Sequence, residues 1–99
     1  MEYVKNMLIG YKRRQERELT RHNKDNPMHE MKLGEIVGLD FALNAITLSD
    51  CKSSISDDVN GFRNKLKKSL EFVRFEEKAK VVGTIQAANF AIELLNIAN

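Results

Sequence analysis

Apolar residues recur at spacings of three and four along most of the chain, which places them on one face of an α-helix. In the first segment, from about Glu2 to about Asn23, the pattern predicts an amphipathic helix. Beyond the third turn this segment becomes charged and only Leu19 continues the apolar face, so we expect its distal end to be solvated. The apolar face consists of Tyr3, Val4, Met7, Leu8 and Tyr11.

A connection over residues 22–27 leads into a second predicted helix over residues 27–48. Asp25 or Asn26 offers a side-chain oxygen that can cap this helix, and Pro27 suits its first position because the N–H that proline lacks has no partner there. Apolar residues cover most of the helix circumference, which is typical of a central helix that contacts several neighbours. The narrow polar strip consists of Asp40, Asn44 and Thr47.

The polar stretch over residues 49–54 is predicted to be a linker, and Ser56, Asp57 and Asp58 to form the cap and acidic first turn of a third helix. A fourth helix, again mostly apolar around its circumference, is predicted over residues 78–97. No proline or glycine separates the third helix from the fourth. A break near residues 75–77 therefore competes with one helix of roughly 40 residues that pairs with a second chain.

The two halves of the chain share an internal pattern. Residues 33–46 (LGEIVGLDFALNAI) align with residues 82–95 (VGTIQAANFAIELL). Earlier in each half, and in the same order, residues 10–13 align with residues 61–64. Two interpretations stay open, namely duplication of a helical hairpin and the similar composition of helical core segments.

Both aligned segments carry glycine or alanine at every fourth position. Such a stripe lets a second helix approach closely, and this offsets the roughly 0.5–1 kcal/mol that a glycine costs inside a helix. The stripe is interpreted either as packing within the chain or as a seam between two copies. The predicted helix-packing or oligomer-interface residues are Gly34, Gly38, Phe41, Ala42, Gly83, Ala87, Phe90 and Ala91.

These elements predict an all-α fold in a single domain over residues 1–99. Two similar helical hairpins, hairpin one over residues 1–50 and hairpin two over residues 51–99, are expected to form a four-helix arrangement. We expect the apolar surface that remains to be covered by dimerisation or by a partner.

Composition and charge narrow the possible partners. The chain is 42% hydrophobic and 30% charged, within the range of ordinary globular proteins. Its net charge of +2 is too small to attract the whole chain to DNA or anionic lipid. Residues 61–80 hold seven basic and three acidic residues, whereas residues 31–60 hold two basic and five acidic residues. A basic surface beside an acidic one suits self-association or docking.

The chain is expected to be soluble and cytoplasmic. It has one cysteine, so no intrachain disulfide can form, which implies a reducing compartment. Lys5 interrupts the apolar residues near the start, so no signal peptide is expected, and no run of about 18 apolar residues is present to span a membrane. Residues 81–98 carry no lysine or arginine, which argues against a membrane-surface helix.

No catalytic, cofactor or metal site is predicted, and we expect the chain not to be an enzyme. His22, His29 and Cys51 match no zinc-binding spacing. Asp40 is aligned with Asn89, and because an amide cannot replace a general base, a structural hydrogen bond fits Asp40 better. No phosphate-binding glycine loop is present.

Two further groups of residues are candidates for contact with a partner. One helix face cannot hide all the nearby phenylalanines, so one of Phe72 and Phe75 is expected to be an exposed protein contact. A basic run could contact phosphates, or it could form a solvated face with the interleaved Glu16 and Glu18. The run consists of Lys12, Arg13, Arg14, Arg17 and Arg21.

The function expected from the sequence is that of a small protein–protein interaction module, a regulator or inhibitor of a larger protein, acting as a homo-oligomer. This compact design without catalytic motifs is also found in proteins of mobile genetic elements that inhibit a host protein. Two alternatives stay open: a nucleic-acid-binding accessory protein that uses the basic outer helices, and a structural subunit of a larger assembly.

Overall fold

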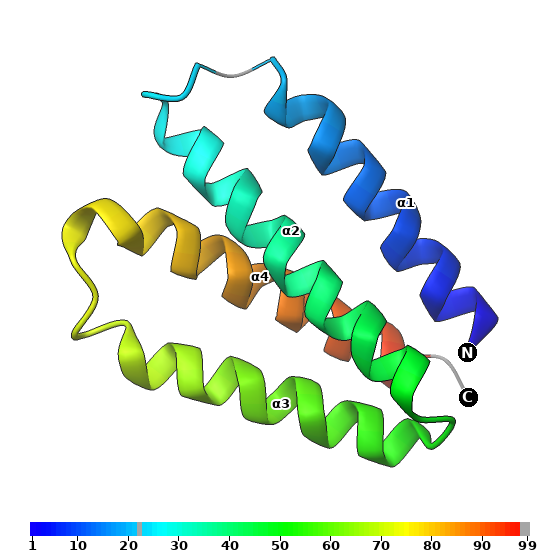
Figure 1. Cartoon of the computed structure of the whole chain (residues 1–99). Coiled ribbons are helices and arrows are strands. Elements are labelled where there is room, and N and C mark those ends of the chain that lie inside the picture. Colours follow the sequence, from blue (N-terminus) through cyan, green and yellow to red (C-terminus); the bar gives the residue numbers. More distant parts are fainter. Residues whose placement is uncertain (22, 98–99) are drawn as a thin grey trace.

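The computed structural model describes residues 1–21 and 23–97, and these residues form four α-helices and no strand (Figure 1). The prediction of an all-α chain with four helices is therefore confirmed. The helices are α1 (Glu2–Leu19), α2 (Pro27–Leu48), α3 (Lys52–Ser69) and α4 (Phe75–Ile97).

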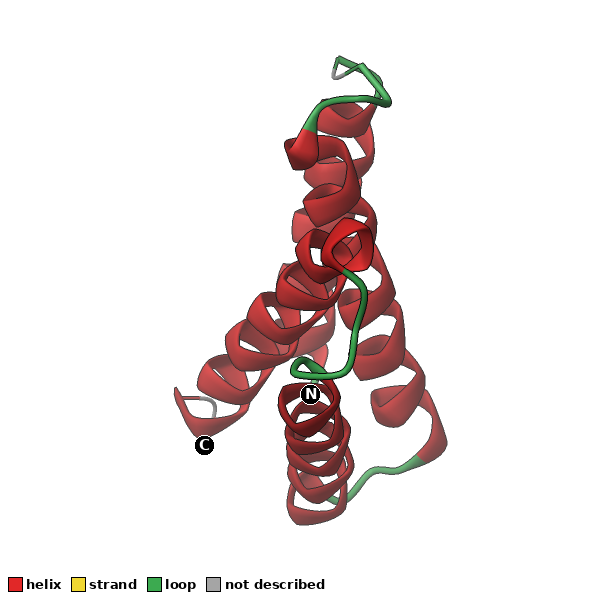
Figure 2. Cartoon of the chain, turned by 90° about the vertical axis from the view of Figure 1, so that its left-hand side faces the viewer, coloured by secondary structure: helices red, strands yellow, loops and turns green. Residues whose placement is uncertain are grey.

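The helices are arranged around a central pair, α2 and α4, which make the most extensive contact in the molecule. α1 packs mainly on α2, and α3 packs mainly on α4, so that α1 and α3 lie on the outside (Figure 1). Among the described residues, the buried core cluster consists of helical residues, and Figure 2 shows the loops joining the ends of the helices. In the part of the chain that the structure describes, no helix is long and apolar enough to cross a membrane.

The core receives residues from all four helices. Val4 and Leu8 of α1, and Ile55 and Val59 of α3, are fully buried, in each case one helical turn apart. Burying a side chain of this size contributes about 1.5–3 kcal/mol, so these positions hold the outer helices against the central pair. The central helices contribute Leu39, Ala42, Ala45, Ile46, Ala87, Ala88, Ala91, Leu94 and Leu95.

The predicted limits of α2 are confirmed. The side-chain oxygen of Asn26 accepts a hydrogen bond from the backbone N–H of Met28 at 2.9 Å, and Pro27 occupies the first turn. This cap satisfies one of the N–H groups that the start of a helix leaves without a partner.

The predicted limits of the outer helices are wrong at two places. α1 ends at Leu19 and not near Asn23, and the hydroxyl of Thr20 donates to the carbonyl oxygen of Arg17 at 2.8 Å. α3 begins at Lys52, inside the stretch predicted to be a linker. Ile55 is buried in the core, and the helical turn over residues 52–55 brings its side chain to that position. His22, at the predicted end of α1, lies outside the described residues.

The break between α3 and α4 spans residues 70–74, earlier than the predicted 75–77, and α4 begins at Phe75 and not at Lys78. The alternative of one continuous helix is therefore wrong. Folding back lets α4 bury its apolar residues against α2 and α3, whereas a single long helix would leave them in water unless a second chain covered them.

Candidate functional site

The stripe of small residues lies between α2 and α4. A Cβ atom on Gly34 would overlap the carbonyl oxygen of Lys80, and one on Gly83 would overlap that of Met31. A Cβ on Gly38 would lie 2.7 Å from the Cβ of Ala87. The helices therefore pack backbone against backbone, and the stripe residues Gly34, Gly38, Ala42, Gly83, Ala87 and Ala91 are buried within the chain, where a second copy cannot reach them.

This central contact is nearly symmetrical. Gly34 and Gly83 are aligned residues, 49 positions apart in the sequence, and each meets the backbone of the opposite helix. The residues that they meet, Lys80 and Met31, are also 49 positions apart. Each half of the chain thus presents the same surface to the other half.

The aromatic contacts of the outer helices repeat in the same way. The rings of Tyr11 in α1 and Phe90 in α4 have centroids 4.8 Å apart. The rings of Phe62 in α3 and Phe41 in α2 are stacked, with centroids 3.9 Å apart. Tyr11 is aligned with Phe62, and Phe90 with Phe41, so one ring pair is the counterpart of the other.

A polar contact also occurs once in each half. Lys12 Nζ lies 2.6 Å from Asp40 Oδ1, and Arg63 Nη1 donates to Asn89 Oδ1 at 3.1 Å. Lys12 is aligned with Arg63, and Asp40 with Asn89. The hydrogen bond to Asp40 raises the pKa of Lys12, which shows that the Lys12 charge is engaged within the chain.

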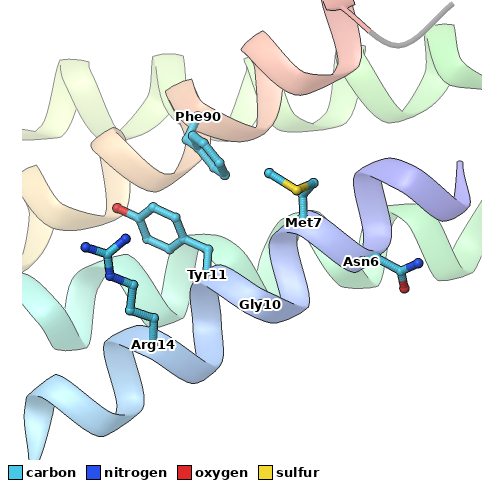
Figure 3. A pocket seen from close by; sticks show the side chains of 6 residues that line it. All are labelled: Asn6, Met7, Gly10, Tyr11, Arg14 and Phe90. Carbon is cyan, nitrogen blue, oxygen red and sulfur yellow. The ribbon is translucent and has the colours of Figure 1, made fainter.

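A groove of about 420 Å³ opens between α1 and α4, and we call it the α1 groove (Figure 3). Gly10 leaves an open place in it, because a Cβ added there would meet no atom within 4 Å. Figure 3 shows the rings of Tyr11 and Phe90 and the side chain of Met7 around this space. The lining residues are Asn6, Met7, Gly10, Tyr11, Arg14 and Phe90.

A groove of about 320 Å³ lies at the equivalent place on α3, and we call it the α3 groove. Each of its lining residues is aligned with one lining residue of the α1 groove, including Gly61 with Gly10. The chemistry differs, since Asp57 and Asp58 replace Asn6 and Met7. The lining residues are Phe41, Asp57, Asp58, Gly61, Phe62 and Lys65.

The turn between α3 and α4 carries the most exposed aromatic side chains. Phe72 and Phe75 are both 86% exposed, whereas the sequence predicted that one of them would be. Phe75 borders a groove of about 410 Å³ between the starts of α2 and α4, which we call the turn groove. Its other lining residues are Lys24, Asp25, Asn26, Pro27, Glu30, Glu76, Lys78 and Ala79.

The structure divides the basic run of α1. Lys12 is paired with Asp40, and Arg14 Nε lies 3.6 Å from Glu18 Oε1. Arg13, Arg17 and Arg21 are exposed. These three arginines follow one another at spacings of four residues, and their charges are open to contact with phosphates.

Sequence reasoning did not find the α1 groove. Gly10 and Gly61 were part of the internal alignment, and both are helical glycines with no neighbour that requires them. The signal available in the sequence was the aligned pair Gly10 and Gly61, which lies outside the small-residue stripe. This pair could have indicated an open groove at the same place in each half.

Within residues 1–21 and 23–97, no group of three or more His, Cys, Asp or Glu side chains is placed to hold a metal ion. His22, one of the three potential soft ligands in the sequence, lies outside the described residues. The candidate binding features that the structure describes are the α1 groove, the α3 groove and the turn groove. No protein-family model, no curated protein and no solved structure matches this chain.

Proposed function

We propose that this chain is a helical protein-binding module, a regulator or inhibitor of a larger protein, and that its partner docks at the α3–α4 turn. The observation that carries the proposal is the 86% exposure of both Phe72 and Phe75. Aromatic side chains are enriched among the few residues that dominate binding energy, and water is a poor environment for two neighbouring phenyl rings.

The turn groove supports a polypeptide as the partner. It combines the Phe75 ring and the apolar Pro27 and Ala79 with charges of both signs at its rim. An apolar centre within a polar rim is the usual anatomy of a protein–protein interface. Its three carboxylates outnumber its two lysines, so nucleic acid fits this surface less well than a polypeptide does.

We also propose that the chain arose by duplication of a helical hairpin, with hairpin one over residues 1–50 and hairpin two over residues 51–99. Support comes from the repeated contacts. The glycine contacts and the ring pairs between the two halves each occur twice at aligned positions, and the polar pair occurs once within each half. Chance similarity between helical core segments accounts for shared residue types but not for shared contacts.

The docking proposal is tested with the double variant Phe72→Ser/Phe75→Ser. Leu48→Ser is the matched control, because Leu48 is also 86% exposed and lies at the far end of α2 from the turn groove. Wild-type and variant proteins are used as bait in cell extract treated with nuclease, and the captured proteins are quantified by mass spectrometry.

We expect a captured partner that the double variant loses and that Leu48→Ser retains. Equal capture by the double variant would show that the turn is not the docking surface. A partner that disappears on nuclease treatment of the wild-type sample would instead favour the nucleic-acid-binding alternative and its basic α1 surface.

A further inference from the structure

We infer that two copies of this chain associate through the face of α1 that lines the α1 groove, with the two α1 helices antiparallel. The inference rests on the proposed protein-binding function and names a second copy as the occupant of the α1 groove. It concerns a different surface from the α3–α4 turn.

This face of α1 carries a line of unburied residues at spacings of four, three and four. Tyr3 is 59% exposed and Met7 is 42% exposed, and Gly10 and Arg14 are exposed as well. Residues at these spacings form the contact line of paired helices. α1 lies at the edge of the bundle (Figure 1), and the exposure of these four residues leaves them accessible to a second molecule.

Gly10 has no role within the chain that requires glycine. A Cβ atom there meets nothing within 4 Å, and alanine in its place would make the helix more stable. The three glycines of the central contact have a neighbouring backbone or side chain to accommodate, whereas Gly10 has only the open α1 groove. Gly61 in the α3 groove is open in the same way, so the α1 groove is distinguished by the residues beside its glycine.

This line of residues can pair with the same line on a second copy that runs in the opposite direction. A two-fold axis that passes midway between Met7 and Gly10 also passes midway between Tyr3 and Arg14. The thioether of Met7 then enters the space above the partner's Gly10, and the guanidinium of Arg14 reaches the partner's Tyr3 ring. Methionine fills irregular spaces well, and a guanidinium is attracted to the face of an aromatic ring.

A parallel pairing lacks both contacts. It would place Arg14 against the partner's Arg14 and would leave an empty space between the two Gly10 residues. The antiparallel pairing uses the same patch on both copies, as closed two-fold dimers do.

Hairpin two provides an internal comparison. At the positions equivalent to Tyr3, Met7 and Arg14, α3 carries Ser54, Asp58 and Lys65, and the α3 groove nevertheless has the same set of lining positions. The fold therefore does not require an apolar line on an outer helix. On α1, the apolar line calls for a separate explanation, which association with a second copy supplies.

The test is the mass of the intact protein in solution, measured by sedimentation equilibrium over a range of concentrations. We expect a dimer whose dissociation constant rises by about tenfold or more in Tyr3→Ser/Met7→Asp, which copies the residues of hairpin two onto α1. Gly10→Gln is expected to act in the same direction, because its side chain occupies the space that the partner's Met7 needs.

The matched control is Gly61→Gln, since Gly61 occupies the equivalent open position in the α3 groove. Both glycine variants should keep the helical circular dichroism spectrum, and Gly61→Gln should keep the wild-type dissociation constant. A strictly monomeric wild-type protein at high concentration, or a dimer that is insensitive to both α1 variants, would overturn the inference. Loss of the dimer on Gly61→Gln would point to contact between α1 and α3 of different copies and would overturn it as well.

The orientation is tested by crosslinking in a Cys51→Ser background. A mixture of Tyr3→Cys and Arg14→Cys proteins should give a crosslinked dimer with a short bifunctional maleimide, and neither protein alone should do so. Efficient crosslinking of Tyr3→Cys to itself would establish a parallel pair and contradict the antiparallel arrangement.

Failure here is distinguishable from failure of the proposed docking at the turn. The variant Tyr3→Ser/Met7→Asp leaves Phe72 and Phe75 intact, so its capture of the partner reports on the turn. The variant Phe72→Ser/Phe75→Ser leaves the α1 line intact, so its mass reports on association.

Discussion

The ammonium group of Lys32 lies between two carboxylates whose titration it affects unequally. Lys32 Nζ is 2.9 Å from Glu18 Oε2 and 3.8 Å from Glu35 Oε2. The hydrogen bond from Lys32 lowers the pKa of Glu18, which is in contact with solvent. Burial raises the pKa of Glu35, and the attraction of Lys32 only partly opposes this effect.

These opposite shifts predict opposite pH dependences. An unfolded glutamate has a pKa of about 4.3. The raised pKa of Glu35 contributes stability that is complete below about pH 4.3 and is lost as the pH rises through the folded-state value. Glu35→Gln should therefore increase the free energy of unfolding at about pH 7, with little change at about pH 3, as measured by thermal unfolding across this range.

Glu18→Gln is the matched comparison for this prediction. The lowered pKa of Glu18 contributes stability above about pH 4.3 that is lost as the pH falls through the folded-state value, so this variant should be less stable than wild type near neutrality. Its effect should shrink in high salt because the Glu18 carboxylate is in contact with solvent. A Glu35→Gln protein that is less stable than wild type at neutral pH would contradict this prediction. It would show that the charged Glu35 carboxylate stabilises the fold through its pair with Lys32.

At the scale of the helices, the contact between α2 and α4 makes Gly83→Ala a severe change. The added methyl group would overlap the backbone oxygen of Met31, which cannot turn away as a side chain can, so the helices have to separate. We expect a loss of about 1–3 kcal/mol or more in the free energy of unfolding, despite the better helix propensity of alanine. Urea denaturation followed by circular dichroism measures this change in the free energy of unfolding.

Gly61→Ala is the control for this prediction, since a Cβ there meets nothing within 4 Å. It should increase stability by up to about 1 kcal/mol. Equal effects of the two substitutions would mean that the central helices do not approach as closely as the structure shows.

The limits of the helices were predictable where a side chain marks them. Asn26 and Pro27 identified the start of α2 because capping and a fixed backbone angle are local properties. The start of α3 was missed because serines predict a linker, while the burial of Ile55, which decides the matter, depends on helices distant in the sequence. α1 ends at Leu19 although no helix breaker follows directly, since no later residue of that segment continues its apolar face.

The residues of the candidate site were also predictable only in part. Periodicity identified the small-residue stripe, but it could not tell whether the helix lying against Gly34 belonged to the same chain. The exposure of both Phe72 and Phe75 follows from the position of the turn, which was predicted a few residues too late. The depth of a groove depends on side chains from two helices, as with Met7 and Phe90, and no single segment contains that information.

At the scale of the whole molecule, the two halves are expected to unfold together. Both tyrosines, Tyr3 and Tyr11, lie in α1, so tyrosine fluorescence reports on the first half, while circular dichroism reports on all four helices. Because α2 and α4 bury each other along the central contact, neither half keeps its core when the other is lost. The two transitions in urea should coincide, as in a two-state unfolding reaction.

A fluorescence transition at lower urea than the circular dichroism transition would contradict this prediction. It would show that α1 leaves the bundle before the rest of the molecule unfolds, which is local unfolding of an outer element.

The position of Cys51 has a practical consequence for spectroscopy. This thiol is free and exposed at the corner between α2 and α3, and the backbone N–H of Ser54 lowers its pKa, which favours reaction with maleimide dyes near neutral pH. The length of α3, about 27 Å at 1.5 Å per residue, separates it from Phe72. A fluorophore attached to the native sequence would thus report the slower tumbling of a complex from a place remote from the proposed docking surface at the α3–α4 turn.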